Sequence, residues 1–126
     1  MLFSGHSPYQ KIEVLADAEG NKSLYLNGLE YFNPSDLEAF NFCLSELPAR
    51  LKQPSSVLIV GSGSMSSVYH ISPFAKEITT VEIDRKVYEA GRLYFKEYNH
   101  LDEIGNWRLV IDDAKHYLKN TGKKFD

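Results

Sequence analysis

The chain has 126 residues, of which 43% are hydrophobic and 25% are charged, so it can bury a core of its own, which excludes a disordered chain. Fourteen Lys and Arg against 17 Asp and Glu give a net charge of −3, and the scattered basic residues argue against a nucleic-acid partner. The apolar runs are too short to span a bilayer and residues 1–5 lack a signal-peptide start, so we predict a cytoplasmic protein with no membrane partner.

The N-terminal part of the chain predicts a small β-unit. Residues 11–15 and 23–26 alternate apolar and polar side chains, as half-exposed strands do. Between them, residues 17–22 have the polarity and the glycine of a hairpin loop. The turn pair Asn27-Gly28 then leads into a third short strand over residues 30–32, so three strands are expected before the first helix.

A helix is predicted after these strands. Residues 33–36 supply cap side chains and a proline suited to a first turn. Apolar residues then recur at helical spacing towards Pro48: Leu37, Phe40, Leu44 and Leu47. Cys43, the one cysteine, lies within this pattern, so we predict a buried thiol rather than a nucleophile, and no internal disulfide.

Residues 53–56 divide the chain into two units, 1–53 and 54–126. In the second unit we predict three strands, over residues 57–60, 78–83 and 108–111. Each strand is followed by a predicted helix, over residues 65–71, 84–98 and 113–119 in turn. Such βα repeats imply parallel strands joined by right-handed crossovers. The expected fold is therefore α/β, with a small N-terminal β-unit followed by a partial Rossmann-like parallel sheet with flanking helices.

The strand over residues 57–60 ends in the turn Gly61-Ser62-Gly63, and the next strand ends on Glu82. In α/β folds a glycine turn lets a ligand approach the backbone, and an acid at the tip of the next strand can hold ribose hydroxyls. We therefore predict a nucleotide site at Gly61, Gly63 and Glu82, with a tight turn and a solvated strand end as the alternative. A dinucleotide fingerprint needs a third glycine where Ser66 stands, so NAD is not favoured.

Asp112 and Asp113 close the third strand at the same edge of the sheet. One of the two is predicted to cap the following helix, and the other to face the cleft and accept an adenine amino hydrogen. Asp84 is predicted to cap the helix that follows Glu82. No metal is assigned, because the four histidines show no metal-ligand spacing with each other or with Cys43.

The sequence resembles the spermidine synthases, which are polyamine aminopropyltransferases. Six blocks occur in the order and spacing of that family: residues 7–12, 24–28, the helix at Asp36, 57–63, 81–84 and 112–114. The resemblance implies an N-terminal β-domain followed by a methyltransferase-type Rossmann domain. It also implies transfer of an aminopropyl group from decarboxylated S-adenosylmethionine, the co-substrate, to a polyamine, which leaves methylthioadenosine. No permanently bound cofactor is expected.

The resemblance assigns the nucleoside half of the site by position. Gln10 matches the glutamine that contacts the nucleoside ligand, and Glu82 matches the acid that binds the ribose. Asp113 and Ala114 match the pair that binds adenine. These roles agree with the chemistry expected of two carboxylates at the end of parallel strands.

The amine half of the site departs from the family pattern. Ser64 stands where the family has an aspartate that helps to hold the cationic diamine, and Met65 and Ser66 replace two glycines. Leu37 replaces an acidic residue, and Asn41 matches a polar residue on the amine side. Asn41 and Ser64 are therefore the candidate substrate-binding residues.

The family places its catalytic aspartate at the end of a fourth strand, beyond residue 126, so no catalytic residue is assigned. Loss of a positioned general base costs about 10²–10⁴ in rate, so we expect no appreciable transfer activity from these 126 residues alone. Ser64 could hydrogen-bond the carboxylate of intact S-adenosylmethionine, which keeps a methyltransferase as an alternative. A catalytically silent nucleoside-binding or assembly module is another.

The family is usually oligomeric, and its fourth strand pairs beside the first. Without that partner, the strand over residues 57–60 would be an apolar, unpaired edge, which invites another chain. We therefore expect a homodimer.

Overall fold

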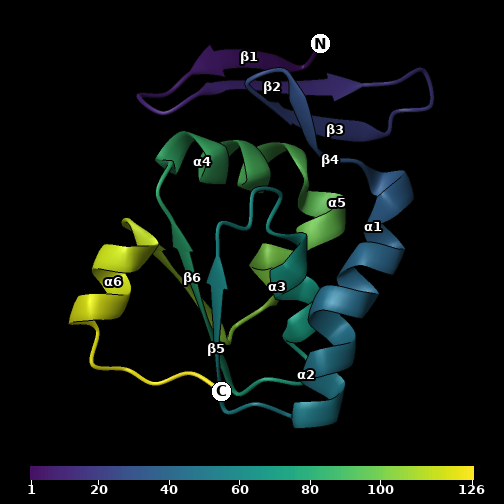
Figure 1. Ribbon diagram of the computed structural model, residues 1–126. Helices are drawn as coiled ribbons and strands as arrows, with labels where there is room; N and C mark the ends of the chain where they lie inside the picture. Colours follow the sequence, from purple (N-terminus) through teal and green to yellow (C-terminus); the bar gives the residue numbers. More distant parts are fainter.

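The computed structural model describes the backbone of residues 1–126 and the side chains of residues 1–35 and 39–126. Its N-terminal unit is a four-stranded antiparallel sheet in the order β1-β2-β3-β4 (Figure 1). The strands are β1 (Phe3–His6), β2 (Lys11–Ala16), β3 (Lys22–Leu26) and β4 (Leu29–Phe32). The last three confirm the predicted strands. The prediction lacks β1, because four residues with one large apolar side chain give too little alternation to indicate a strand.

A continuous helical run follows β4. It consists of α1 (Pro34–Asn41), the π-helix η1 (Phe42–Glu46) and α2 (Leu47–Lys52). The run continues one turn beyond the predicted end near Pro48, because this proline lies in the first turn of α2, where proline is tolerated. Gln53, in the left-handed conformation with φ 48°, ends the run.

The buried side of this helical run is not the one that the apolar spacing predicts. Cys43 is exposed, as are Phe40 and Leu44, so the predicted buried thiol is wrong. The buried positions, about one turn apart, are Asn41, Ser45 and Ala49. Small side chains at this spacing let the run lie close to helix α3 (Ser66–Ile71), which leaves the larger apolar residues facing outward. Leu37, also in the predicted stripe, lies outside the described side chains.

The second unit holds a three-stranded parallel sheet in the order β5-β6-β7. Its strands are β5 (Ser56–Val60), β6 (Glu77–Glu82) and β7 (Trp107–Ile111). Helix α3 follows β5, α4 (Arg85–Tyr94) follows β6, and α6 (Ala114–Asn120) follows β7. The α/β fold class, with an antiparallel unit ahead of a parallel sheet, is therefore confirmed.

The predicted helix over residues 84–98 is two helices. The first, α4, ends at Tyr94. It is followed by Phe95, whose side chain is fully buried and whose backbone (φ −116°, ψ 28°) is not helical. After it come α5 (Lys96–Asn99) and the 3₁₀-helix η2 (Leu101–Glu103). None of the helices formed by the described residues is long and apolar enough to span a bilayer.

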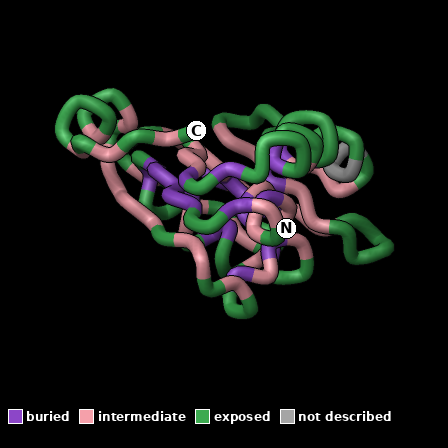
Figure 2. The backbone as a smooth tube through the Cα atoms, turned by 90° about the horizontal axis from the view of Figure 1, so that it is seen from below, coloured by how far each residue is buried: buried purple, intermediate pink, exposed green. Residues whose placement is uncertain are grey.

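Helix α4 lies between the two sheets (Figure 1). Ile12, Val14 and Leu24 of the N-terminal sheet share one core with Val87 and Ala90 of α4. A second core joins the helical run, α3 and the parallel sheet: Ala49, Met65, Val68, Ile71, Ala75, Ile78 and Leu101. In Figure 2 the buried segments run through the interior, with exposed helices around them. The N-terminal sheet is thereby held over the carboxyl ends of the parallel strands.

Strand β5 is an open edge of the parallel sheet. In the described backbone it pairs with β6 alone, which confirms the expected edge. Asp126 reaches its start: the Asp126 N–H donates to the Ser56 carbonyl over 2.9 Å, and the Asp126 carboxylate accepts from the N–H groups of Ser55 and Ser56. A groove of about 500 Å³ lies between the edge and the helical run, with apolar walls that include Leu44 and Val60.

Candidate functional site

The glycine turn after β5 meets the N-terminal sheet. Gly61 and Gly63 have φ values of +64° and +48°, in the left-handed region that favours glycine. A Cβ on Gly63 would lie 2.5 Å from Cε1 of Tyr31, so a larger residue there would have to displace the Tyr31 ring. The Tyr31 hydroxyl donates to the Gly61 carbonyl over 3.2 Å. Strand β4 is therefore packed directly on the turn that the sequence marks as a ligand site.

Glu82 lies at the carboxyl end of β6 and is only 6% exposed. Its Oε1 accepts a hydrogen bond from the Asp84 N–H over 2.9 Å. Burial raises the pKa of Glu82 above its ordinary value, and the neighbouring Asp84 carboxylate adds to the rise, against the opposite effect of the hydrogen bond from the Asp84 N–H and of the nearby Ile83 and Gly63 amides. The alternative of a solvated strand end is wrong, because this carboxylate is buried beside the glycine turn.

The raised pKa makes Glu82 a cost to folding when it is ionised. The ionised Glu82 carboxylate destabilises the folded state. This effect is absent below the pKa that Glu82 has in the unfolded chain, and it grows as pH rises through the higher pKa that Glu82 has in the folded chain. Glu82→Gln should therefore raise the thermal unfolding midpoint at about pH 7.5, with a gain that shrinks towards about pH 4.

Glu77, at the other end of β6, provides the control, because its substitution should change the unfolding midpoint in the opposite direction. Hydrogen bonds from Lys123 and Ser56 lower the pKa of Glu77, so its contribution to stability is present above the unfolded pKa. Glu77→Gln should therefore lower the midpoint, and more at neutral than at acidic pH. A gain from Glu82→Gln that is equal at both pH values would contradict this assignment.

Of the two acids at the end of β7, Asp113 takes the predicted capping role. Asp113 caps α6, because its Oδ1 accepts from the His116 N–H over 3.0 Å, while its Oδ2 has no hydrogen bond from the described residues. Asp112 Oδ2 lies 2.8 Å from His116 Nδ1, a contact that lowers the pKa of Asp112 and raises that of His116. The Asp112 N–H donates to the Glu82 carbonyl, which brings the ends of β6 and β7 together.

Asp84 joins Gln10 to this edge of the sheet. Its carboxylate is buried and caps α4 by accepting from the Lys86 N–H over 3.1 Å, as predicted. The same carboxylate accepts from Gln10 Nε2 over 3.1 Å, across 74 positions of sequence. Sequence reasoning missed this second role, because no local signal marks a partner so distant along the chain.

The two amine-side candidates lie in a separate buried network. Ser64 and Asn41 are 3% and 1% exposed. The Ser64 and Ser66 hydroxyls are hydrogen-bonded over 3.1 Å, and Asn41 Nδ2 donates to Ser66 Oγ over 3.3 Å. These residues line a cavity of about 460 Å³ between the helical run, β4 and the glycine turn.

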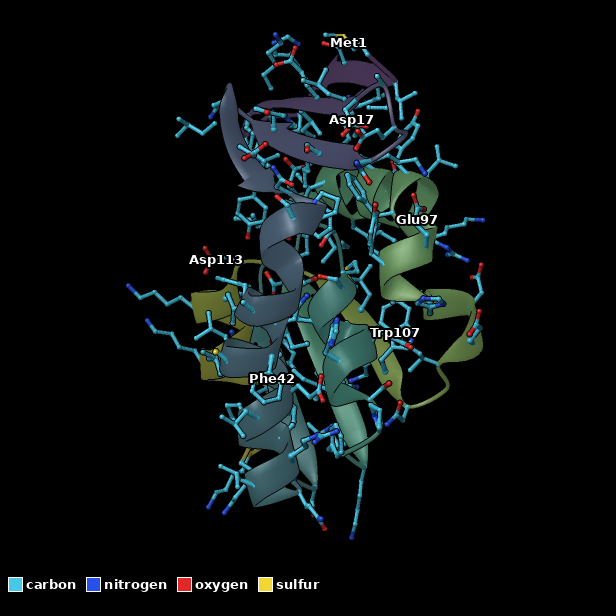
Figure 3. All side chains as sticks on the ribbon, turned by 90° about the vertical axis from the view of Figure 1, so that its right-hand side faces the viewer. Met1, Asp17, Phe42, Glu97, Trp107 and Asp113 are labelled. Carbon is cyan, nitrogen blue, oxygen red and sulfur yellow. The ribbon has the colours of Figure 1, made fainter. Side chains whose placement is uncertain are left out.

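The predicted site residues therefore form two groups. The cavity is lined by Asn41, Gly61 and Ser64, whereas Gln10, Glu82 and Asp113 do not line it. In Figure 3 the labelled Asp113 lies at the margin of the molecule, below the N-terminal sheet, which agrees with its exposure. Among the described side chains, no three His, Cys, Asp or Glu residues are placed to hold a metal ion.

Known proteins match almost the whole chain. A sequence model of the spermine/spermidine synthase domain matches residues 39–126. Polyamine aminopropyltransferases of Thermoplasma acidophilum and Thermococcus onnurineus are 27% and 30% identical, each over 99% of this chain but 47% and 45% of their own. Spermidine synthase 2 of Arabidopsis thaliana is 28% identical over 98% of this chain and 37% of its own.

Solved structures agree with the fold. The crystal structure of spermidine synthase from Thermotoga maritima superposes with a TM-score of 0.88 at 24% identity, over 99% of this chain and 45% of that one. A spermidine synthase in complex with the transition-state analogue AdoDATO gives the same values. The chain thus spans less than half the length of these relatives.

Proposed function

The chain belongs to the spermine/spermidine synthase family, and on that premise we propose that it binds the adenosyl part of an S-adenosylmethionine-type co-substrate. One observation carries the proposal: the buried carboxylate of Glu82 lies at the end of β6, next to the glycine turn, whose Gly61 N–H donates to the Val81 carbonyl over 2.9 Å. A carboxylate accepts hydrogen bonds, and the two hydroxyls of a ribose donate them. The co-substrate proposed for the whole protein is decarboxylated S-adenosylmethionine, with a polyamine as acceptor.

The remaining nucleoside contacts belong to the same proposal. Gln10 contacts the nucleoside from the N-terminal sheet, and the backbone at Gly61 and Gly63 gives the ligand room to approach. Asp113 and Ala114 receive the adenine. Asp113 can cap α6 through Oδ1 and still accept an adenine amino hydrogen through Oδ2.

Aminopropyl transfer requires more than donor binding. An amine attacks the carbon next to a sulfonium, so a positioned base must first take a proton from that amine. Asn41 and Ser64 are proposed to face the amine, but neither side chain is a base near neutral pH. Transfer is therefore proposed for the whole protein, and no catalytic residue is assigned. We expect an assay of this polypeptide with putrescine and the decarboxylated donor to give no appreciable turnover.

The choice of donor separates the transferase from a methyltransferase. Ser64 is neutral, whereas an acid at that position would repel the carboxylate of intact S-adenosylmethionine. Like-charge contacts cost several kcal/mol, so without one we expect intact and decarboxylated donors to bind within about tenfold of each other. Calorimetric titration with both donors and with methylthioadenosine measures this.

Each outcome of the titration has one meaning. A preference of about a hundredfold, or about 2.7 kcal/mol, for the decarboxylated donor contradicts the role given to Ser64 and removes the methyltransferase alternative. Comparable binding of the two donors supports the role of Ser64. No binding of any of the three compounds contradicts the proposed function itself.

We propose that the open edge of β5 drives self-association, so that this polypeptide forms a homodimer. Val60 on that edge is 56% exposed, and exposed apolar Leu44 lies across the groove. Val60→Lys should shift the light-scattering mass towards the monomer, because a lysine on an edge strand opposes pairing. Leu93→Lys, at an exposed position of α4, is the matched control and should change nothing. A wild-type monomer at high concentration would refute the proposal.

A further inference from the structure

The Asp84 carboxylate accepts three hydrogen bonds. It is 1% exposed and follows Glu82 by two residues. Its Oδ1 accepts from the Lys86 N–H, which caps α4. Its Oδ2 accepts from Ser7 Oγ over 2.5 Å and from Gln10 Nε2 over 3.1 Å. Helix α4 and the turn between β1 and β2 are thus tied to one buried group.

This carboxylate determines which end of the Gln10 amide faces it. An ionised carboxylate only accepts hydrogen bonds, so the amide must turn its NH₂ group towards Asp84 and its carbonyl away. The Gln10 Oε1 atom has no hydrogen bond from the described residues, which leaves it available as an acceptor.

The backbone of Gln10 is fixed by the same turn. Ser7 Oγ accepts from the N–H groups of Tyr9 and Gln10, each over 3.1 Å, while donating to Asp84. The Ser7 N–H also donates to the Gln10 carbonyl over 2.9 Å. Neither the backbone nor the amide of Gln10 can therefore turn freely.

Glu82 is attached to the other side of the same residue. Its Oε1 accepts from the Asp84 backbone N–H, so Asp84 holds Glu82 through its amide and Gln10 through its carboxylate. Both Gln10 and Glu82 then offer acceptors, which suits a ligand with two neighbouring hydroxyl donors. We propose that Asp84 is a positioning residue that directs the Gln10 carbonyl oxygen to a ribose hydroxyl. This inference rests on the proposed nucleoside site.

The variant Asp84→Asn reverses the amide without removing the helix cap. Asparagine caps a helix as well as aspartate, and the Lys86 N–H requires an oxygen at the Oδ1 position. The new NH₂ group must then occupy the Oδ2 position, where Gln10 can meet it only with its carbonyl oxygen. The Ser7 hydroxyl loses its acceptor there and donates instead to the Gln10 backbone carbonyl, which lies 3.3 Å away. Gln10 would present a donor to the ribose in place of an acceptor. Binding of methylthioadenosine should weaken about tenfold, the loss expected for one hydrogen bond.

The double variant Asp84→Asn with Gln10→Glu provides the rescue. The introduced glutamate can accept from the introduced asparagine with one oxygen and offer its other oxygen to the ribose. Binding should therefore return to within about threefold of the wild type, a difference below one net hydrogen bond. Gln10→Glu alone places a second carboxylate beside that of Asp84, in place of the Gln10 amide that now lies 3.1 Å away. Because the two like charges repel, this single variant should bind methylthioadenosine poorly. A merely structural role for Asp84 gives no reason for the double variant to recover.

Calorimetry with methylthioadenosine distinguishes the outcomes, with thermal unfolding of each variant measured alongside. Weakening by Asp84→Asn followed by recovery in the double variant supports the positioning role. Unchanged binding by Asp84→Asn overturns it, as does a double variant that binds no better than Asp84→Asn. If the wild type itself does not bind methylthioadenosine, the proposed function fails instead, so the two failures are separable.

Discussion

Replacing Gly91 with alanine is expected to lower the free energy of unfolding by about 2 kcal/mol, although alanine favours a helix over glycine by about 1 kcal/mol. Gly91 lies in α4, where the helix packs against the glycine turn. A Cβ at this position would lie 2.3 Å from the Gly63 carbonyl oxygen and 3.5 Å from the Ser64 carbonyl carbon. Both are backbone atoms, which cannot turn aside as a flexible side chain can. Overpacking against them exceeds the gain in helix propensity.

A second contact holds the two segments in this arrangement. Asn99 is buried, and its Nδ2 donates to the carbonyls of both Ser64 and Gly91 over 3.0 Å. A shift of α4 that relieves the added methyl would therefore also break these hydrogen bonds. The glycine turn and α4 are expected to move together or not at all.

Urea unfolding of the Gly91→Ala variant measures this effect. Gly105→Ala is the matched control, because no atom lies within 4 Å of its added Cβ and Gly105 has no positive φ. The control should be as stable as the wild type or slightly more stable, since alanine restricts the unfolded chain. A Gly91→Ala variant with wild-type stability would show that α4 does not lie against the turn as described.

Replacing Glu82 with alanine should weaken methylthioadenosine binding by about a hundredfold or more, because each hydrogen bond to a charged group contributes about 1.5–3 kcal/mol. The buried carboxylate is the acceptor proposed for the ribose hydroxyls. In the same proposal Gln10 offers the ribose only an uncharged amide oxygen and Asp113 contacts the adenine, so neither can replace the Glu82 carboxylate.

Glu77→Ala is the control for this variant. Glu77 is the first residue of β6 and Glu82 is the last, and each substitution removes one carboxylate. The Glu77 carboxylate contacts Lys123 and Ser56, far from the glycine turn. Calorimetry should give wild-type affinity for Glu77→Ala. A Glu82→Ala variant that binds within about threefold of wild type, well under the loss of one such bond, would exclude Glu82 as the ribose ligand.

The same variant bears on the alternative of a silent assembly module. Under that alternative the mass measured by light scattering should be unchanged in Glu82→Ala, and no nucleoside should bind even to the wild type. Under the nucleoside proposal, wild-type binding is lost in the variant while the mass stays the same. The two hypotheses therefore differ in whether the wild-type chain binds a nucleoside.

Local patterns in the sequence were sufficient for the parallel sheet and for a helix after each strand, but not for the break between α4 and α5. Strands β5 and β6 each have a short apolar run that ends in a distinctive residue, the glycine turn or Glu82, and these patterns depend only on neighbouring residues. Asp84, and one of the pair Asp112 and Asp113, were predicted as caps for the same reason. The family resemblance added Gln10, which no local pattern would have indicated.

The features that sequence reasoning missed depend on packing between distant segments. The helical run buries Asn41 and Ser45 rather than Phe40, because it must approach α3 closely, and spacing alone cannot reveal which face does so. The link from Asp84 to Gln10 likewise depends on how the N-terminal sheet lies over α4. A hydrophobic pattern reports how apolar a face is, not which neighbour covers it.

The central claim is that the carboxyl edge of the parallel sheet binds an adenosine moiety. The most direct measurement is the map of backbone amide chemical shifts in the wild-type chain during titration with methylthioadenosine. We predict that the largest changes fall at residues 61–64, at Ile83 and Asp84, and at Asp113 and Ala114. Saturation without changes at these amides, or with changes confined to the groove between β5 and α2, would contradict the account.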